Sequence, residues 1–288
     1  MNHCIARATR AVLVAFLASS STLALAATVY SLNATPGDNF TNAGGTSQGQ
    51  AVGATGWYYN NTRNSGIVGI NDTFARSGNG SVQMQTTQGP GIPSSKADIE
   101  YLANAVNVGG NWFAAGSLGS FASFSGMSYD WYRSSTSTNS AVQHPSLRVL
   151  VDLDGNVLTN DRIGLVFERA YNTPSTVSTD AWVSDAVGST TNVWTFGALG
   201  FATDGYNKTL ASWQTDGRLA SAVVVGFSSG VGSGWGPFSG AVDNIAWAFG
   251  NTATSTNFEV QAQAVPLPGT LTLVMAGLLG LATLRRRR

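Results

Sequence analysis

The feature that most constrains the fold is the recurrence of short alternating or apolar segments separated by glycine-rich turns. Period-two alternation predicts half-buried strands, and glycine tolerates the positive φ that tight turns demand. Only Lys208–Gln214 reads as a helical turn. The pattern therefore predicts an all-β fold, an antiparallel β-sandwich. The expected strands are 56–61, 66–70, 82–86, 97–103, 121–133, 146–153, 162–171, 180–187, 192–201, 221–228 and 240–250, with irregular covering and one short edge strand over 33–55.

Two stretches narrow the fold class by resemblance. ARSGNGSVQM lies near the start of the strand-rich region and GSGWGPFSGAVDNIAW near its end. Both are similar to jelly-roll domains of the carbohydrate-binding-module type, and other stretches look like secreted bacterial domains of no settled activity. The resemblance implies a jelly-roll-like sandwich, with glycan binding as a function to test.

The end of the chain has three parts. They are Val265, Pro266, Leu267 and Pro268, then an uncharged apolar run, then Arg285, Arg286, Arg287 and Arg288. As a helix, the apolar run would be about 24 Å long, slightly short of a hydrocarbon core of about 30 Å. Arginines beside such a helix stay in the cytoplasm, so we expect a transmembrane helix with the main body across the membrane. The alternatives are a core helix, which would bury four charges, and a nucleic-acid-binding arm, which would not need the apolar run.

This tripartite order resembles the C-terminal signal of the PEP-CTERM family of exported bacterial proteins. Leu267 between the prolines makes it look more like the VPLPA-type variant than the usual Pro-Glu-Pro. The resemblance implies an exosortase-type sorting enzyme as partner, transient anchoring in the inner membrane, and then the cell surface or the exopolysaccharide matrix of a biofilm. The resemblance covers only the tail, and it implies a destination of the protein rather than a biochemical activity.

The start of the chain has the parts of a secretory signal peptide. Arg7 and Arg10 precede an apolar stretch, and Ala24 and Ala26 occupy the −3 and −1 positions of a cleavage site. We expect signal peptidase to remove residues 1–26; an uncleaved anchor helix is the alternative. Cys4, the single cysteine, would leave with the peptide, so no disulfide would stabilise the exported part. The expected domains are the signal peptide 1–26, a β-sandwich 27–250, a polar linker 251–264 and the sorting tail 265–288.

Charge argues against nucleic-acid binding. Six of the fifteen basic residues lie in the signal peptide and the tail, whereas all fifteen acidic residues lie between them. The exported body is thus net negative, and nucleic-acid binding needs a basic face. We expect a non-enzymatic surface or matrix protein, with a glycan-binding module as the alternative and a carbohydrate-active hydrolase third.

Aromatic side chains are the candidates for glycan contact, because sugar rings stack on flat side chains that carry a polar tip. Trp57 and Tyr58 lie on one expected strand, and Trp235 lies in a glycine-rich loop. Strand alternation sends every second residue inward, so packing in the core is the competing interpretation for each of them.

No group of residues in the sequence predicts catalysis. Gly226–Gly230 matches G-x-S-x-G, but no helix-forming sequence follows Ser228, and His144 lies upstream rather than downstream. Glycoside hydrolysis needs two carboxyl groups, and nothing in their spacing pairs Glu168 with Asp130. We therefore expect no catalytic residues.

No cofactor is expected, although a structural calcium ion is the one metal worth testing. Asp152, Asp154 and Asn156 offer oxygen ligands at alternating positions, as a calcium loop does, but Val157 stands where an EF-hand has glycine. A hairpin turn explains the same residues and is favoured. Asp243, on a later strand, is a further weak calcium candidate.

Overall fold

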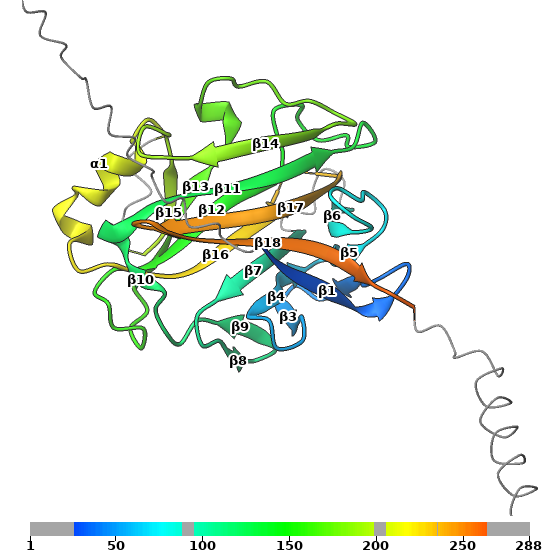
Figure 1. The fold of residues 1–288 in the computed structure, drawn as a ribbon, viewed down its shortest axis with the longest axis horizontal. Helices are drawn as coiled ribbons and strands as arrows, with labels where there is room; N and C mark the ends of the chain where they lie inside the picture. The colour runs from blue at the N-terminus through cyan, green and yellow to red at the C-terminus, as the bar shows by residue number, and fades with distance from the viewer. Residues whose placement is uncertain (1–25, 88–94, 199–205, 235, 264–288) are drawn as a thin grey trace, which may run out of the picture.

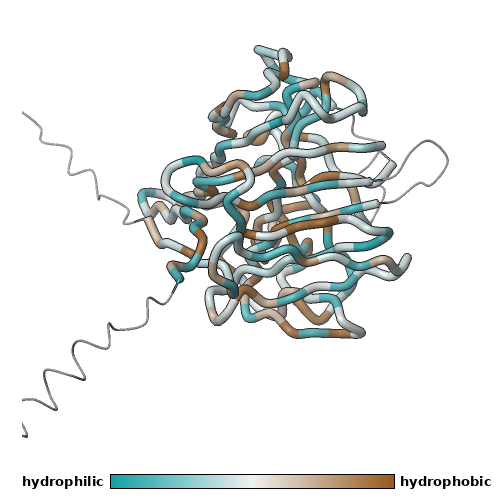
Figure 2. The backbone as a smooth tube through the Cα atoms, turned by 90° about the vertical axis from the view of Figure 1, so that its right-hand side faces the viewer, coloured by the Kyte–Doolittle hydropathy of each residue, from teal (hydrophilic) through white to brown (hydrophobic). Residues whose placement is uncertain are grey.

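Two β-sheets enclose a shared apolar core in the computed structural model of the chain (Figure 1). The structure describes residues 26–87, 95–198, 206–234 and 236–263. Within them the chain is mostly strand, which confirms the expected all-β sandwich. Hydrophobic segments lie along the strands in the middle of the molecule (Figure 2).

The first sheet, which we call sheet A, is built around β17. Its strands are β1 (Ala26–Ala34), β18 (Thr252–Gln261), β17 (Phe238–Phe249), β6 (Ser81–Thr86), β5 (Gly66–Asn71), β2 (Phe40–Asn42), β11 (Phe124–Arg133) and β14 (Trp182–Val187). β17 pairs with β11 on one side, and with β6 and then β18 on the other. Sheet A is antiparallel except for the parallel pair β1 and β18.

The second sheet, sheet B, is antiparallel throughout its described pairs. Its strands are β15 (Trp194–Gly197), β13 (Arg162–Phe167), β12 (Ser146–Asp152), β16 (Val223–Gly232), β7 (Lys96–Leu102), β4 (Trp57–Arg63) and β3 (Gln48–Ala51), with β10 (Gly119–Ser120) beside β16. A separate hairpin of β8 (Val106–Val108) and β9 (Asn111–Phe113) lies next to β3 and β4.

Aromatic side chains join the two sheets in the core. Trp57 on β4 meets Phe258 on β18 edge to face, with ring centroids 4.9 Å apart. Phe227 on β16 stacks on Trp247 of β17 at 4.5 Å. All four are almost fully buried. Such pairs add specific geometry to the hydrophobic gain of burial, so they fix how one sheet lies on the other.

The described helices are short. They are α1 (Leu210–Gln214) and the 3₁₀ turns Phe121–Ser123, Arg169–Tyr171 and Gly217–Leu219. The Thr209 hydroxyl caps α1 by accepting the Ser212 N–H, and buried Trp213 donates its indole N–H to the Val193 carbonyl. The expected helical turn at Lys208–Gln214 is therefore confirmed.

The expected linker 251–264 is wrong, because Thr252–Gln261 forms β18. Thr256, Phe258 and Val260 alternate inward and are buried. Small, mostly polar residues from Thr252 to Ser255 precede them and resemble linker sequence, and only two of the three inward residues are apolar. The irregular covering expected over 33–55 likewise contains β2 and β3, and β1 precedes it.

The two expected sorting signals lie almost entirely outside the described residues. Ala24 and the whole tail from Val265 to Arg288 are outside them, whereas exposed Ala26 opens β1. Among the residues that the structure describes, no helix has the length and apolar character needed to cross a membrane.

Candidate functional site

Three adjoining pockets form a groove on the outer face of sheet B. Their volumes are about 210, 340 and 250 Å³. The first two share Lys96, Arg148 and Phe196, and the last two share Glu168 and Trp194. Because neighbouring pockets have walls in common, they make one continuous surface across β7, β16, β12, β13 and β15. We call it the sheet B groove.

Strand alternation places the charges of the groove. On β7, Ala97 and Ile99 point into the core and are fully buried. Lys96, Asp98 and Glu100 occupy the positions between and beside them, so they lie on the outer face. One strand thus contributes a cation and two carboxyl groups to the floor of the groove.

A buried carboxylate fixes the two cations of the floor. Asp98 is completely buried and lies 2.7 Å from the Lys96 ammonium and 3.0 Å from the Arg148 guanidinium. Arg148 also donates to the Ser228 hydroxyl at 3.1 Å. Burial alone would raise the pKa of Asp98, but Arg148 and Lys96 outweigh it and hold that pKa below its usual value. The donors of the floor are thereby held in place before any ligand arrives.

Two glutamates add acceptors to the groove. Glu100 accepts N–H bonds from the side chains of Asn60 at 2.6 Å and Asn61 at 2.8 Å. Burial, and then the neighbouring Asp98 charge, raise the pKa of Glu100. Glu168 accepts the Trp194 indole N–H at 3.3 Å, and burial raises its pKa too.

A run of aromatic rings borders one end of the groove. The centroids of Phe196 and Trp194 are 6.3 Å apart, those of Trp194 and Tyr206 5.7 Å, and those of Tyr206 and Tyr171 4.2 Å. Phe196 and Tyr206 remain 40% and 49% exposed. Phe196 lies opposite Gly164 on β13, where a Cβ atom would overlap its ring. Glycine at this position therefore gives the ring room to lie across the neighbouring strand.

The opposite end of the groove has a second aromatic wall, carried by the β8–β9 hairpin. The Asn60 side chain anchors that hairpin by bonding both the N–H and the carbonyl of Trp112. Trp112 packs on Tyr58 with centroids 4.6 Å apart, and Phe113 beside it is 43% exposed. The groove thus has aromatic walls at both ends and hydrogen-bonding groups between them.

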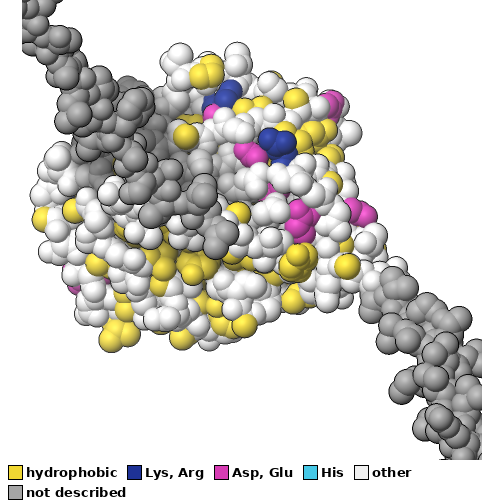
Figure 3. Space-filling view, in the orientation of Figure 1, with side chains coloured by type: hydrophobic (Ala, Val, Ile, Leu, Met, Phe, Trp, Pro, Cys, Tyr) yellow, Lys and Arg dark blue, Asp and Glu magenta, His cyan; other side chains and the backbone are white. Residues whose placement is uncertain are grey.

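The charges around the groove balance. Lys96, Arg148 and Arg162 are cationic, whereas Asp98, Glu100 and Glu168 are acidic. On the opposite face, where the strands of sheet A lie in front in Figure 1, charged side chains are also few (Figure 3). This balance suits an uncharged ligand better than a polyanion.

The three aromatic residues expected to contact a glycan differ in where they lie. Trp57 is 1% exposed and packs in the core, so its side chain does not face the solvent. Tyr58 is half-buried on the outer face of sheet B, under Trp112. Trp235 lies outside the described residues. Of the two that the structure describes, Tyr58 contributes to the groove indirectly, by packing on Trp112.

The residues weighed for catalysis do not assemble. The G-x-S-x-G match lies within β16, and Ser228 is buried against Arg148. His144 is a core histidine whose Nε2 accepts the Arg169 N–H at 2.9 Å. Glu168 follows β13 of sheet B, whereas Asp130 belongs to β11 of sheet A and pairs with Arg76.

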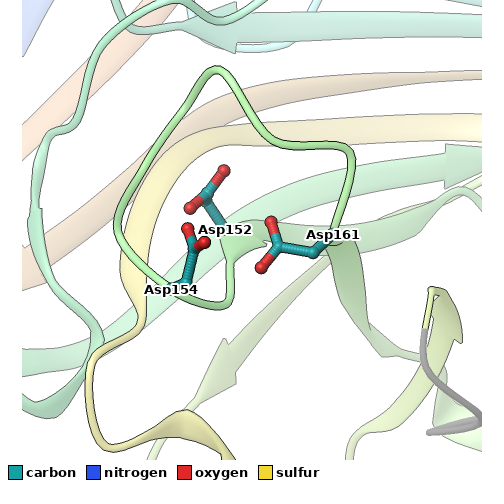
Figure 4. A group of neighbouring side chains, drawn as sticks. All are labelled: Asp152, Asp154 and Asp161. Carbon is teal, nitrogen blue, oxygen red and sulfur yellow. The ribbon is translucent and has the colours of Figure 1, made fainter.

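The calcium candidates separate in the same way. Asp152 and Asp154 lie in the β12–β13 hairpin with Asp161, which is not among the calcium candidates expected from the sequence (Figure 4). The Asn156 side chain accepts the Leu158 N–H in the same loop. Asp243 lies on β17 of sheet A and bonds the N–H groups of Asn244 and Phe258.

Most residues of the groove were missed from the sequence. One signal was available: Lys96, Asp98 and Glu100 are charged residues at three successive same-face positions of an otherwise apolar strand. Burying such a row in an apolar core costs free energy, so the row indicates an outer face of the sheet that has a function. Nothing local in the sequence indicates that Arg148 or Phe196 meets this row.

Comparisons with solved structures give a weak likeness. No protein-family model and no curated protein matches the chain. A solved structure of a family 11 carbohydrate-binding module from Clostridium thermocellum, in complex with a β-1,3-1,4-mixed-linked tetrasaccharide, is 10% identical, with a TM-score of 0.32. The match covers 75% of this chain and 98% of that one. This likeness is too distant to carry a ligand or an activity over to the chain.

Proposed function

We propose that the sheet B groove binds an uncharged glycan chain, and that the protein is an exported, non-enzymatic component of the cell surface or matrix. The observation that carries the proposal is the pairing of exposed rings at both ends with a fixed polar floor between them. Sugar rings stack on aromatic side chains, while their hydroxyl groups need both donors and acceptors. Lys96 and Arg148 supply donors, and Glu100 and Glu168 supply acceptors.

An extended chain fits better than a single sugar. The three pockets follow one another across five strands, and the rings from Phe196 to Tyr171 lie along them: Phe196 lines the first two pockets, Trp194 the last two, and Tyr206 and Tyr171 the last. The Asp98 ion pairs hold the floor in place, which lowers the ordering cost that a ligand must otherwise meet.

The test is affinity electrophoresis through gels that contain neutral or anionic polysaccharide, including that of the producing cells. The proposal expects retardation by a neutral polymer, and Phe196→Ala weakens it about tenfold, or about 1.4 kcal/mol. Tyr30→Ala is the matched control, because Tyr30 is an exposed ring (55%) on β1 of sheet A. Equal loss in both variants, or no retardation by any neutral polymer, would refute the proposal.

Hydrolysis is the second candidate, because Glu100 and Glu168 both line the groove and both have raised pKa values. We expect no hydrolysis, since two asparagine amides hold the almost fully buried Glu100 carboxylate. The measurement is the release of reducing ends from a bound polysaccharide. Release that Glu168→Gln abolishes would replace binding by catalysis as the function.

A further inference from the structure

Three carboxyl groups converge at the end of sheet B, where β12 turns into β13. Asp152 is the last residue of β12, Asp154 lies in the loop, and Asp161 immediately precedes β13. One oxygen of each lies within 4.8 Å of the others. Figure 4 shows all three side chains directed at a common space inside the loop.

Asp152 is a buried carboxylate without a well-aligned hydrogen bond. Its exposed fraction is 0%, and neither of its oxygens accepts a hydrogen bond of good geometry, although the Gly155 N–H interacts with it. The nearest cation, the Nε of Arg162, lies 3.7 Å from Oδ2, beyond hydrogen-bonding distance. The Nη2 of Arg162 instead donates to the carbonyls of Ala114 and Val157, at 2.7 Å each. A buried carboxylate normally has its bonds satisfied, so this one indicates a missing positive partner.

A hairpin turn alone does not explain this cluster. The turn uses Asp154, whose Oδ1 accepts the Asn156 N–H at 2.7 Å, and Thr159, which bonds the Asn156 carbonyl at 2.6 Å. Neither bond involves Asp152. Even with Arg162 counted, the three carboxylates leave an excess of two negative charges in a small space.

The donor atoms select the class of cation. The group offers carboxylate oxygens, with the Thr159 hydroxyl within 3.1 Å of Asp154 and 3.0 Å of Asp161. Ca²⁺ takes six to eight oxygen ligands in flexible geometry, whereas Mg²⁺ demands a near-ideal octahedron, and zinc sites are usually built from cysteine and histidine. We propose that the β12–β13 loop is a calcium site, with Asp152, Asp154 and Asp161 as its ligands.

The site adjoins the sheet B groove. Arg162 lines the groove and reaches both the carbonyl of Ala114, next to Phe113, and the carbonyl of Val157 in the loop. Calcium would therefore fix the loop on which Arg162 rests. The site does not depend on the proposed glycan function, and its test needs no glycan.

The test is calorimetric titration of the full-length protein, freed of divalent ions with EDTA, with calcium chloride and with magnesium chloride. We expect one calcium per chain, magnesium at least about tenfold weaker, and a rise in melting temperature with calcium. Asp154→Asn and Asp161→Asn weaken calcium binding at least about tenfold, because each removes a charged ligand from a mostly exposed loop. Asp72→Asn, at an exposed aspartate outside the group, leaves binding unchanged.

Asp152→Asn gives an independent readout. Without calcium it melts no lower than the wild type, because it removes an uncompensated buried charge, and calcium no longer raises its melting temperature. If Asp152→Asn fails to fold, the two loop variants decide the question. The absence of saturable calcium binding by the wild type, or unchanged binding by both loop variants, would overturn the proposal.

Discussion

Asp243 links the stability of the fold to pH. Burial is the main reason that the pKa of this carboxyl group rises to about 7, and the nearby Glu259 and Asp130 charges add to it. The bonds from the N–H groups of Phe258 and Asn244 act in the opposite direction. The pKa of Asp243 is higher in the folded state than in the unfolded state. The protonated carboxyl group therefore stabilises the fold fully below about pH 4, and this contribution is lost as the pH rises through about 7.

We therefore predict that the wild type loses stability relative to Asp243→Asn as the pH is raised from about 4 to about 8. The expected change is on the order of 2–4 kcal/mol in the free energy of unfolding, measured with urea at each pH. Burial lowers the pKa of His144 to about 4, which destabilises the fold in acid, but this effect cancels between the two proteins. If the difference in unfolding free energy between the two proteins does not vary with pH, the raised pKa of Asp243 is contradicted.

Gly164 offers a second test at a single residue. A methyl group there would overlap the ring of Phe196, and the ring is the part free to move. We predict that Gly164→Ala weakens glycan binding about as much as Phe196→Ala, while the free energy of unfolding changes by less than about 1 kcal/mol. The control is Gly188→Ala, because a Cβ at Gly188 meets no atom within 4 Å. Unchanged binding in Gly164→Ala would show that this ring does not contact the ligand.

At the scale of elements, β18 is a strand although its composition suggests a linker, and substitutions can test which of the two it is. Phe258 is fully buried against Trp57, whereas Thr254 on the same strand is exposed. Phe258→Ala should cost about 3–5 kcal/mol of unfolding free energy, as other buried phenylalanines do. Thr254→Ala should cost less than about 1 kcal/mol. If chemical denaturation shows similarly small losses of unfolding free energy for both variants, the segment behaves as a linker and not as a strand of the sandwich.

The sequence predicts the strands that alternate or are strongly apolar, and it fails where polarity hides the pattern. β12, β16 and β17 carry enough valine and aromatic residues for local periodicity to reveal them. β18 does not, because threonine, serine and asparagine make up most of its first six residues. The groove was harder to predict, since its floor joins β7 to β12, some fifty residues apart along the chain. Register between distant strands decides which residues meet, and no local pattern encodes it.

At the scale of the whole molecule, the proposed export accounts for the two ends of the chain. Mass spectrometry of both mature termini should find a start at Ala27 and a processed or membrane-retained tail. Gly277→Asp places a charge in the apolar run at a cost of about 2.5–3.5 kcal/mol, and should release unprocessed protein into the medium. A cytosolic protein with both ends intact would contradict this part of the account.

The central claim, that the sheet B groove holds a glycan, is tested most directly by hydrogen exchange with and without a retained neutral polysaccharide. Protection should appear in β15 and β9, which carry the aromatic walls, and in β7 beneath them. β14, on sheet A, should exchange at the same rate in both samples. Protection confined to β14 and its neighbours, or none in β15 and β9 while the polymer is bound, would contradict the claim.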